Sequence, residues 1–516
     1  MSFPAFLRRA AQFWGDRTAV RCGARTLSYR ALDERSTRLA NALYALGLAK
    51  GDRVAIQARN CVELVEIECA LYKAGLVKAA MNARFSAAEV SDLVQSSAPR
   101  VLIAGPGFTH YHAGTPGFES IEAFVAIGGA ADGYADYETL LASAPARRMD
   151  IRMAPGDLAV LHFSSGSTGK VKAAMQSYGN RLAAFRKVLL SDSEVRAGDR
   201  LALLGPVTHA SGMLVQPNLF RGTELVLFER FDPAEFLDVV GRLGITHTMM
   251  VPAMLNMLLA EPGLERANLA TLRALSYGAA PMAPARIREA WERIGPILAQ
   301  GYGASESTSG VARLSIADHA HAIAHRPERL ASCGRPFAES EVRVVDEAGN
   351  DVSGDAIGEI VIRGDDVFQG YWGEPALTAE TIVDGWLHTG DLARVDEDGY
   401  LYLVDRKKDM IISGGFNVYP TEVEAALYRH PDVFEACVIG VPDPTWGESV
   451  KAVIALKAGA AARPAELIAH CRTLIADYKA PKSVELVQEL PKNPNGKLAR
   501  KVVREPYWQG VDRRVN

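Results

Sequence analysis

Four segments of the sequence combine residue types that suit chemistry on a phosphorylated ligand. The strongest is the run SSGSTGK at 164–170, which directly follows an apolar, strand-like run at 158–163. Its glycines let backbone N–H groups approach a polyphosphate closely, and its hydroxyls and lysine add further donors. The run does not fit the G-x-x-x-x-G-K-[ST] phosphate loop, because the chain has Ser164 where that loop needs Gly and Val171 where it needs Ser or Thr.

The other three segments would add an aromatic ring, two carboxylates and a cation. Tyr302 to Glu306 (YGASE) places a ring that can stack on a base near a carboxylate that can bind Mg²⁺. Trp386 to Asp391 (WLHTGD) ends in a carboxylate that could accept two ribose hydroxyls. Lys497 ends the Pro/Asn/Gly loop PKNPNGK, and a lysine there suits charge neutralisation during phosphoryl or adenylyl transfer.

Each segment also has a simpler interpretation when it is taken alone. The run at 164–170 could be a flexible Ser/Gly turn, and 302–306 a surface turn. Asp391 could form an Asx turn, and Lys497 could be an ordinary solvated lysine. Their occurrence together along one chain favours a shared function, because the probability that all four are coincidences is the product of four separate probabilities.

The elements that must position these segments alternate between strand-like and helical patterns. Short β-branched runs and longer amphipathic segments follow each other over about 52–298, which predicts parallel sheets covered by helices. In one unit a strand at 225–228 leads to Asp232-Pro233, a typical helix start, and the helix stops at Gly244 before a second strand at 246–251.

After Arg335 the pattern changes to antiparallel hairpins, such as 392–395 with 400–404. The charged run 405–409 follows, and then a small α+β unit in which we expect Thr421 and Glu424 to form a helix capping box. We therefore expect an α/β protein with a large N-terminal domain of helix-covered, mostly parallel sheets and a small β-barrel-like part. A small, mobile C-terminal α+β domain would complete it.

Composition argues against several classes of protein. The sequence has 57 Lys and Arg against 61 Asp and Glu, so no general basic field points to nucleic acid or an acidic membrane. Its 6 cysteines include no C-x-x-C pair, which argues against a zinc site or a disulfide scaffold. No run approaches the roughly 20 apolar residues of a transmembrane helix, and the N-terminus lacks the apolar run of a signal peptide. We expect a cytoplasmic protein without a nucleic-acid partner or a transmembrane segment.

Taken together, the segments resemble the adenylate-forming (AMP-binding) superfamily, and within it the acyl-CoA synthetases that ligate fatty or aryl acids to coenzyme A. The resemblance covers essentially the full chain. It also rests on PVTH at 206–209, YGAAP at 277–281, GE at 358–359, GYW at 370–372, DRKKD at 405–409, GGFNVYP at 414–420 and WGE at 446–448.

The resemblance implies a two-step reaction. A carboxylate attacks the α-phosphorus of Mg·ATP, pyrophosphate leaves, and a thiol then attacks the acyl-adenylate to give a thioester and AMP. It also implies an N-terminal ATP- and acyl-binding domain at 1–405, a hinge at 406–409 and a C-terminal lid domain at 410–516. The cofactors would be ATP, Mg²⁺ and coenzyme A as co-substrate.

The resemblance further implies which residues bind the nucleotide. The phosphates would be held by Ser165, Gly166, Ser167, Thr168, Gly169 and Lys172, with Thr168 and Glu306 near Mg²⁺. The adenine side would be formed by Gly278, Ala279, Ala280, Tyr302, Gly303 and Ser305, and the ribose would be bound by Asp391 and Arg406.

By the same resemblance, Lys497, Glu306, Thr168 and His209 carry the catalytic roles. Lys497 would bridge the substrate carboxylate and the α-phosphate, and His209 would be the gate between the nucleotide and acyl pockets. Lys408 matches the hinge position, and Gly414-Gly415 matches the loop that lines the pantetheine tunnel.

The acid and the acceptor are less closely defined. We expect the acyl pocket at 209–213, 251–254, 277–280 and 307–311, which are small or apolar. No Lys or Arg lies between Arg200 and Arg221, so a second substrate carboxylate would lack a counter-charge and a dicarboxylate is disfavoured. Alkyl and aryl acids both fit, with a slight preference for fatty or other hydrophobic acids.

Three further alternatives stay open for the activity. The few residues that follow Lys497 favour coenzyme A over a fused carrier domain as acceptor, but transfer to a free carrier protein is also compatible. A luciferase-like oxygenase and a non-catalytic acyl or nucleotide sensor are the others. Retention of Lys172, Asp391 and Arg406 argues against the sensor. The sequence does not define an oligomeric state and allows a homodimer.

Overall fold

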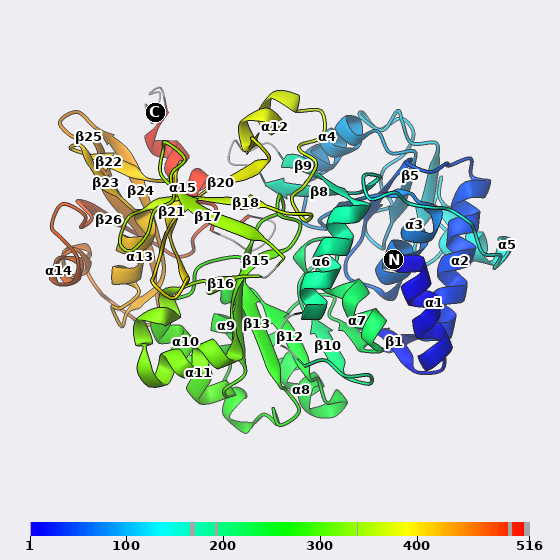
Figure 1. Cartoon of the computed structure of the whole chain (residues 1–516), viewed down its shortest axis with the longest axis horizontal. Helices are drawn as coiled ribbons and strands as arrows, with labels where there is room; N and C mark the ends of the chain where they lie inside the picture. The colour runs from blue at the N-terminus through cyan, green and yellow to red at the C-terminus, as the bar shows by residue number, and fades with distance from the viewer. Residues whose placement is uncertain (1, 166–170, 191–193, 338, 494–497, 510–516) are drawn as a thin grey trace.

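Two helix-covered sheets make up most of the N-terminal part of the chain (Figure 1). The structure, a computed structural model, describes residues 2–165, 171–190, 194–337, 339–493 and 498–509. The first sheet has nine strands in the order β16-β15-β14-β13-β12-β10-β11-β1-β2, parallel from β14 to β1. Its strands are β1 Thr18–Cys22, β2 Arg25–Ser28, β10 Arg200–Leu203, β11 Glu224–Leu227, β12 His247–Met250, β13 Ala274–Gly278, β14 Leu298–Gly303, β15 Gly310–Leu314 and β16 Arg335–Pro336.

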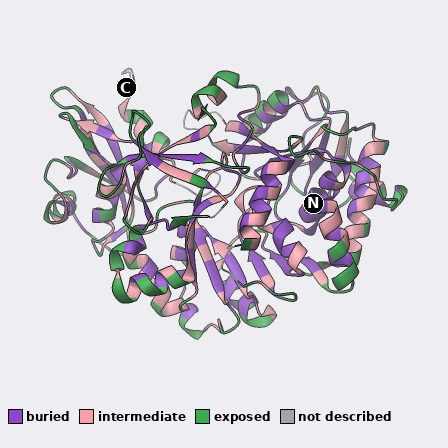
Figure 2. Cartoon of the chain, in the orientation of Figure 1, coloured by how far each residue is buried: buried purple, intermediate pink, exposed green. Residues whose placement is uncertain are grey.

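The second sheet has seven strands in the order β7-β6-β5-β3-β4-β8-β9, and only the β8–β9 pair is antiparallel. Its strands are β3 Arg53–Gln57, β4 Val77–Met81, β5 Val101–Ala104, β6 Ala123–Ala126, β7 Ala135–Asp136, β8 Leu158–Ser165 and β9 Val171–Ser177. Buried residues concentrate in the strands of these sheets (Figure 2). The predicted fold of helix-covered, mostly parallel sheets is confirmed.

The helices follow the strands as the alternating sequence pattern predicts. They are α1 Phe3–Trp14, α2 Tyr29–Ala45, α3 Val62–Ala74, α4 Ala87–Ser97, α5 Tyr137–Ser143, α6 Tyr178–Leu190, α7 Val215–Arg221, α8 Pro233–Leu243, α9 Pro252–Ala260, α10 Pro284–Ile294, α11 Ile316–His325, α12 Pro375–Thr381, α13 Pro420–Leu427, α14 Pro464–Leu474 and α15 Arg500–Arg504. At α8 the Asp232 side chain accepts from the Glu235 backbone N–H, and Gly244 ends the helix with a left-handed φ of 67°. Helix α6 packs against β8 and β9 of the second sheet and against α7. Helix α7 in turn packs against β11 of the first sheet.

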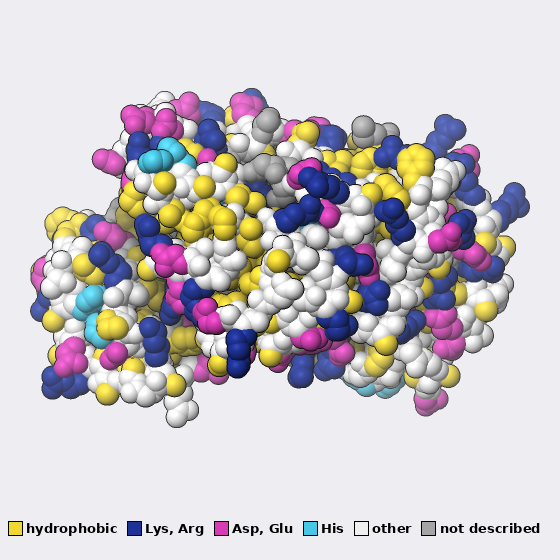
Figure 3. Space-filling view, turned by 90° about the horizontal axis from the view of Figure 1, so that it is seen from below, with side chains coloured by type: hydrophobic (Ala, Val, Ile, Leu, Met, Phe, Trp, Pro, Cys, Tyr) yellow, Lys and Arg dark blue, Asp and Glu magenta, His cyan; other side chains and the backbone are white. Residues whose placement is uncertain are grey.

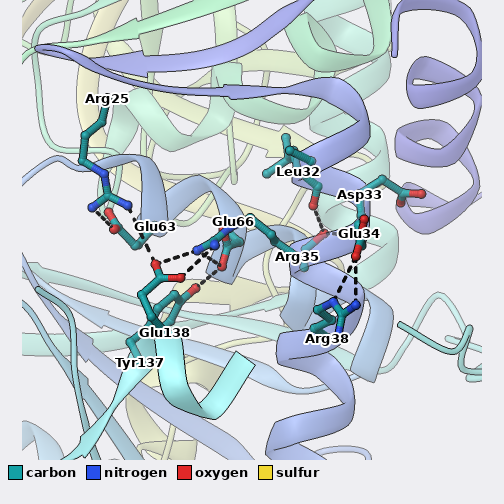
Figure 4. A network of polar contacts seen from close by, with 12 residues as sticks. Arg25, Leu32, Asp33, Glu34, Arg35, Arg38, Glu63, Glu66, Tyr137 and Glu138 are labelled. Atoms are coloured by element: carbon teal, nitrogen blue, oxygen red, sulfur yellow. Dashed lines mark hydrogen bonds and ion pairs between the residues drawn. The ribbon is translucent and has the colours of Figure 1, made fainter. Parts of the chain in front are cut away.

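Helix α3 is buried along nearly all of its length, including three glutamates. Two of them are neutralised by arginines from other elements (Figure 4): Glu66 pairs with Arg35 of α2 at 2.6 Å, and Glu63 pairs with Arg25 of β2. The Tyr137 hydroxyl of α5 also donates to Glu66 at 2.5 Å. A buried carboxylate needs such partners because its desolvation is costly, so these pairs fix α2, α3 and α5 together.

The rest of the chain forms two smaller sheets, both expected from the sequence. The first is antiparallel, β17-β18-β20-β19 with β21 against β20. Its strands are β17 Glu341–Val345, β18 Gly358–Arg363, β19 Ile382–Val383, β20 Trp386–Val395 and β21 Leu401–Arg406. The second, β23-β22-β25-β24 with β26 against β25, forms the C-terminal α+β unit with α13, α14 and α15. Its strands are β22 Ile411–Ser413, β23 Phe416–Val418, β24 Val433–Asp443, β25 Gly447–Leu456 and β26 Ser483–Val487.

The expected capping box at Thr421 is wrong. Helix α13 begins at Pro420, and no side chain caps it at Tyr419. The Thr421 backbone N–H instead donates to the Asp405 carboxylate at 3.0 Å, and its hydroxyl donates to the Val404 carbonyl. Glu424 accepts from the Val438 backbone N–H at 2.8 Å. Thr421 and Glu424 therefore hydrogen-bond to residues distant in the sequence instead of capping the helix as local sequence rules predicted.

Charges of both signs share the face drawn in Figure 3, and the cysteines are unpaired. Lys and Arg are interspersed with Asp and Glu on the face in Figure 3. All 6 cysteines are free thiols. Within the described ranges, no helix is long and apolar enough to cross a bilayer.

The end of β13 is held by a buried histidine on α11. The His319 ring has 0% exposure, its Nδ1 lies 2.8 Å from the Ser315 carbonyl, and its Nε2 lies 2.8 Å from the Tyr277 hydroxyl. A carbonyl only accepts, so Nδ1 carries the proton and Nε2 accepts from Tyr277. Burial lowers the pKa of His319 to about 4.

This low pKa predicts a loss of stability in acid. His319 is protonated near pH 6.5 in the unfolded chain and only near pH 4 in the folded one, so the unfolded chain binds more protons between these values. Acidification from pH 7.5 to 5 should cost about 2 kcal/mol through this residue. Thermal unfolding at both pH values should show a smaller pH effect in His319→Gln than in the unaltered chain. Equal pH effects in the two proteins would contradict this assignment.

Candidate active site

The predicted site residues of the N-terminal part meet at the carboxyl ends of the parallel strands of the nine-stranded sheet. Segments after β10, β12, β13 and β14 all leave the sheet at this edge, where α/β proteins usually bind ligands. The other two sheets of this part reach the same place. Gln176 of β9 donates to the Ser305 carbonyl at 3.0 Å, and the Phe368 backbone N–H donates to the Glu306 carbonyl at 2.8 Å. Three sheets thus converge on the segment that follows β14.

The Asp391 carboxylate joins β14 to the antiparallel sheet. The Tyr302 hydroxyl, at the end of β14, donates to Oδ2 at 2.7 Å, and Arg406 Nε donates to Oδ1 at 3.0 Å. Asp391 on β20 is directly opposite Arg406 on β21. Burial and the nearby Asp391 raise the pKa of Tyr302 well above its usual value, so its hydroxyl stays protonated and donates. The structure therefore brings together Tyr302, Asp391 and Arg406, as the sequence predicts for an adenosine site.

Glu306 lies in a second cluster with Lys172 and a tyrosine. The Tyr371 hydroxyl donates to Glu306 Oε1 at 2.6 Å, and Lys172 Nζ lies 5.1 Å from the centre of the Tyr371 ring. Backbone pairing of Ala174 with Tyr371 fixes the ring between the β8–β9 hairpin and the Glu306 segment. An acidic and a basic side chain predicted to serve the phosphates thus share one aromatic neighbour.

The backbone after β13 has a constrained conformation at the predicted adenine segment. Ala279 has a left-handed φ of 69°, which is unusual for a residue with a side chain. A Cβ on Gly278 would lie 2.3 Å from the Gly301 carbonyl oxygen, so only glycine fits there. Such strain is concentrated at functional sites, and it turns the chain away from the sheet directly after Tyr277.

His209 lies beside a buried histidine at the junction of the two large sheets. Its ring stacks on His162 of β8 with centroids 4.6 Å apart. Burial, followed by His209, Arg181 and Lys78, lowers the pKa of His162 well below its usual value. His162 is therefore neutral at physiological pH, and its ring packs against that of His209.

The residues predicted for the second step lie in and after the turn that follows β21. Arg406 is the last residue of β21 in the antiparallel sheet, and Ile411 is the first residue of β22 in the C-terminal sheet. Lys408 lies between them and is exposed. Gly414 and Gly415 form the β22–β23 turn with φ of 59° and 81°. A Cβ on Gly414 would lie 2.6 Å from the Trp446 ring, so glycine is required by both conformation and space.

Several predicted site residues lie outside the part of the chain that the structure describes. They are Gly166, Ser167, Thr168, Gly169 and Lys497. Ser165 ends β8 and pairs with Val171 of β9, and Ser164 pairs with Lys172. Their roles remain predictions.

The described residues fit a magnesium nucleotide. Lys172 and Arg406 supply positive charge, and the Asp391 carboxylate can accept hydrogen bonds from the hydroxyl groups of a ribose. Glu306 Oε2 has no hydrogen-bond partner among the described residues, which leaves a hard oxygen ligand of the kind that Mg²⁺ prefers. No cluster of three or more His, Cys, Asp or Glu within the described ranges could hold a metal by itself. Mg²⁺ would therefore take further ligands from phosphate and water.

Sequence reasoning missed three residues at this edge. Tyr371 belongs to a segment that carried the resemblance, but its role depends on Glu306, 65 positions away. Arg181 and Lys78 belong to none of the recognised segments. In the predicted acyl segment, the Met213 sulfur nevertheless contacts the Arg181 guanidinium, and a Cβ on Gly212 would lie 3.8 Å from Lys78 Nζ.

Comparison with known proteins identifies the family. The AMP-binding enzyme model matches residues 7–372, and the AMP-binding enzyme C-terminal domain model matches residues 422–497. The chain is 38% identical over 501 residues to a feruloyl-CoA synthase of an Amycolatopsis species, covering 97% of this chain and 98% of the relative. It is 35% identical over 499 residues to the medium/long-chain-fatty-acid–CoA ligase FadD8 of Mycobacterium tuberculosis, covering 94% and 86% respectively.

Solved structures agree with the fold. ATP-bound MatB from Rhodopseudomonas palustris has a TM-score of 0.87 at 30% identity, over 98% of this chain and 99% of that one. The amide bond synthetase McbA from Marinactinospora thermotolerans has a TM-score of 0.86 at 30% identity, over 98% and 100%. Both domain models, the full-length relatives and the site at the sheet edge agree, and the chain therefore belongs to the AMP-binding enzyme family as an AMP-forming acyl-CoA ligase.

Proposed function

We propose that the chain activates a hydrophobic carboxylic acid as its acyl-adenylate and transfers the acyl group to coenzyme A. The observation that carries this proposal is the convergence of Tyr302, Asp391 and Arg406 with Glu306 and Lys172 at one sheet edge. The first three residues suit an adenosine and the last two suit its phosphates. A site with both groups of residues binds a nucleoside triphosphate as a whole.

In the first step, a substrate carboxylate oxygen attacks the α-phosphorus of ATP, the bond to the β-phosphate oxygen breaks, and pyrophosphate leaves. Lys172 and the segment 165–169 would hold the β- and γ-phosphates, and Lys497 would neutralise charge between the carboxylate and the α-phosphate. Glu306 and Thr168 would hold Mg²⁺, which supplies further positive charge at the phosphates when bound. The protein contributes mainly position and charge.

In the second step, the C-terminal unit would rotate about residues 406–409. Gly414-Gly415 would then face the pantetheine arm of coenzyme A, and its thiol sulfur would attack the acyl carbon. The thiol proton passes to solvent, the bond from the acyl carbon to the AMP oxygen breaks, and a thioester and AMP leave. His209, whose ring stacks on His162, would be the gate between the nucleotide and acyl pockets.

The proposed acid is hydrophobic. Two relatives are named feruloyl-CoA synthase and medium/long-chain-fatty-acid–CoA ligase, and a third, from Aromatoleum aromaticum and 34% identical over 518 residues, is named indoleacetate–CoA ligase. These names include aryl and alkyl acids, which agrees with the small and apolar residues expected around the acyl group. A cytoplasmic location and a homodimer remain predictions from the sequence.

A carrier protein is the second candidate acceptor. A relative from Streptomyces coeruleorubidus, 35% identical over 510 residues, is named fatty acid–[acyl-carrier-protein] ligase. One reaction separates the candidates: enzyme, Mg·ATP, coenzyme A and a pooled panel of alkyl and aryl acids, analysed by mass spectrometry. An acyl-CoA peak with equivalent AMP supports the proposal. Acyl-adenylate without thioester would contradict coenzyme A as the acceptor and point to a carrier protein or to oxygen.

Lys497→Ala should separate the two half-reactions. Loss of this cation should reduce adenylate formation by at least about a hundredfold, because it removes charge stabilisation in the first step. Conversion of supplied acyl-adenylate to thioester should persist. Pyrophosphate release and thioester formation are measured separately, and an equal loss of both would contradict a role in the first step alone.

Lys408→Pro should have the opposite effect. Proline fixes φ at the proposed hinge and would prevent the rotation between the two steps. We expect pyrophosphate release with coenzyme A absent to be close to that of the unaltered enzyme, with thioester formation at least about tenfold slower. Normal thioester formation would contradict a hinge at this position.

Tyr371→Phe should weaken the use of magnesium. It removes the hydroxyl that donates to Glu306 at 2.6 Å, a hydrogen bond to a charged group that is worth about 1.5–3 kcal/mol. The Mg²⁺ concentration for half-maximal ATP–pyrophosphate exchange should rise about tenfold or more. Tyr402→Phe is a matched control, because the hydroxyl of Tyr402, on β21, also donates to a carboxylate, that of Asp396, at 3.0 Å. An unchanged magnesium requirement in Tyr371→Phe would contradict the role of Glu306.

A further inference from the structure

A buried group of charged side chains lies directly behind the predicted acyl segment 209–213. It consists of Arg181 on α6, Lys78 on β4 and Glu68 on α3, which are 6%, 8% and 4% exposed. None of them belongs to a segment that carried the family resemblance. Burial of this kind is costly unless each charge is compensated, so the partners of each charge matter.

Both carboxylate oxygens of Glu68 have a partner among the neighbouring side chains. Lys78 Nζ lies 2.5 Å from Oε2, and the Gln216 side-chain amide of α7 donates to Oε1 at 3.3 Å. The carboxylate therefore neutralises Lys78.

Arg181 has no comparable counter-charge. Its Nε donates to the Tyr72 hydroxyl at 3.1 Å, and its Nη1 faces the Gln176 carbonyl oxygen at 3.4 Å and the Met213 sulfur. Within the described ranges, no carboxylate forms an ion pair with this guanidinium and no acceptor lies at Nη2. Two buried cations thus face one buried carboxylate, and an arginine does not lose its proton in a protein.

The excess positive charge borders the acyl segment. Met213 contacts the Arg181 guanidinium, and a Cβ on Gly212 would lie 3.8 Å from Lys78 Nζ. The same guanidinium also donates, through Nη1, to the Gln176 side-chain oxygen, and the Gln176 amide nitrogen donates to the Ser305 carbonyl, next to Glu306. His162, which supports His209, is also within electrostatic reach of both cations. Arg181 therefore lies between the acyl segment and the nucleotide-binding edge.

We propose that Arg181 is a specificity-determining residue whose guanidinium selects acids that carry a hydrogen-bond-accepting oxygen in the tail, rather than purely hydrocarbon acids. An oxygen brought by the substrate would compensate the cation that Glu68 leaves unpaired. This inference rests on the proposed function and refines its substrate class. It also corrects the sequence-based argument against counter-charge: no Lys or Arg lies between Arg200 and Arg221, but Arg181 and Lys78 reach the acyl segment from elsewhere in the chain.

The first test needs no variant. The value of kcat/KM is measured as pyrophosphate release for matched acids: cinnamate against para-hydroxycinnamate, and hexanoate against its ω-hydroxy acid and adipate. We expect at least about a tenfold preference for the oxygen-bearing member in the series that the enzyme uses best, because a site with buried polar groups rejects an analogue that leaves them unpaired. Preference for adipate over the ω-hydroxy acid would identify an anionic tail, and the reverse a neutral one.

The second test replaces the guanidinium. Arg181→Met keeps an unbranched, flexible side chain but removes the guanidinium and its charge, so the ratio of kcat/KM between the oxygen-bearing acid and the hydrocarbon acid should fall to about onefold. Arg181→Lys should retain a preference. Arg186→Met is the matched control on the same helix, where the half-buried Arg186 pairs with Glu339 at 3.0 Å, and the preference of this variant should be unchanged.

Two results would overturn the inference while leaving the proposed function intact. One is an unaltered enzyme that uses hydrocarbon acids as well as or better than their oxygen-bearing partners, a measurement that stands even if Arg181→Met fails to fold. The other is an equal loss for both members of a pair in Arg181→Met, which would indicate a structural role. If no acid of either kind yielded an acyl-CoA, the proposed function itself would fail and the inference with it.

Discussion

The arrangement of the site depends on one carboxylate shared between two sheets. Asp391 accepts from Tyr302 at the end of the parallel strand β14 and from Arg406 at the end of β21. These contacts hold the antiparallel sheet over the carboxyl edge of the nine-stranded sheet. Because the proposed hinge begins at Arg406, the same carboxylate fixes where the C-terminal unit starts. A ribose bound at Asp391 would therefore lie beside the point about which that unit turns.

Buried charge has two different uses in the N-terminal part. On α3, Glu63 and Glu66 are compensated by Arg25 and Arg35, and these pairs join helices to one another. Glu68, two residues after Glu66, pairs with Lys78, but within the described ranges no carboxylate forms an ion pair with the nearby Arg181. Complete compensation stabilises a fold, whereas incomplete compensation leaves a charge that a ligand can satisfy. The incomplete group is also the one that borders the acyl segment.

Sequence reasoning predicted features whose cause is local. The start of α8 at Asp232 and its end at Gly244 follow from capping chemistry, and the β20–β21 hairpin from the turn at Asp398-Gly399. It failed where distant partners decide: Thr421 bonds to Asp405 instead of capping a helix. In the site, Tyr302, Asp391 and Arg406 were predictable because their segments resemble a known family. Arg181 was not, because only packing reveals that the nearby Glu68 pairs with Lys78 and that no carboxylate forms an ion pair with Arg181 within the described ranges.

The C-terminal unit shows how a proposed hinge can move a catalytic loop. Arg500 on α15 pairs with Glu424 of α13 at 2.6 Å and with Asp409 at 3.3 Å, while Asp405 is further away at 3.8 Å. Arg500 is thus held by Glu424, which follows the proposed hinge, and by Asp409, the last residue of that hinge. Lys497 precedes Arg500 by three residues in the sequence, so a rotation about 406–409 would carry it with this unit. One movement would then withdraw the first-step cation and bring Gly414-Gly415 forward, which is the exchange that the two reactions require.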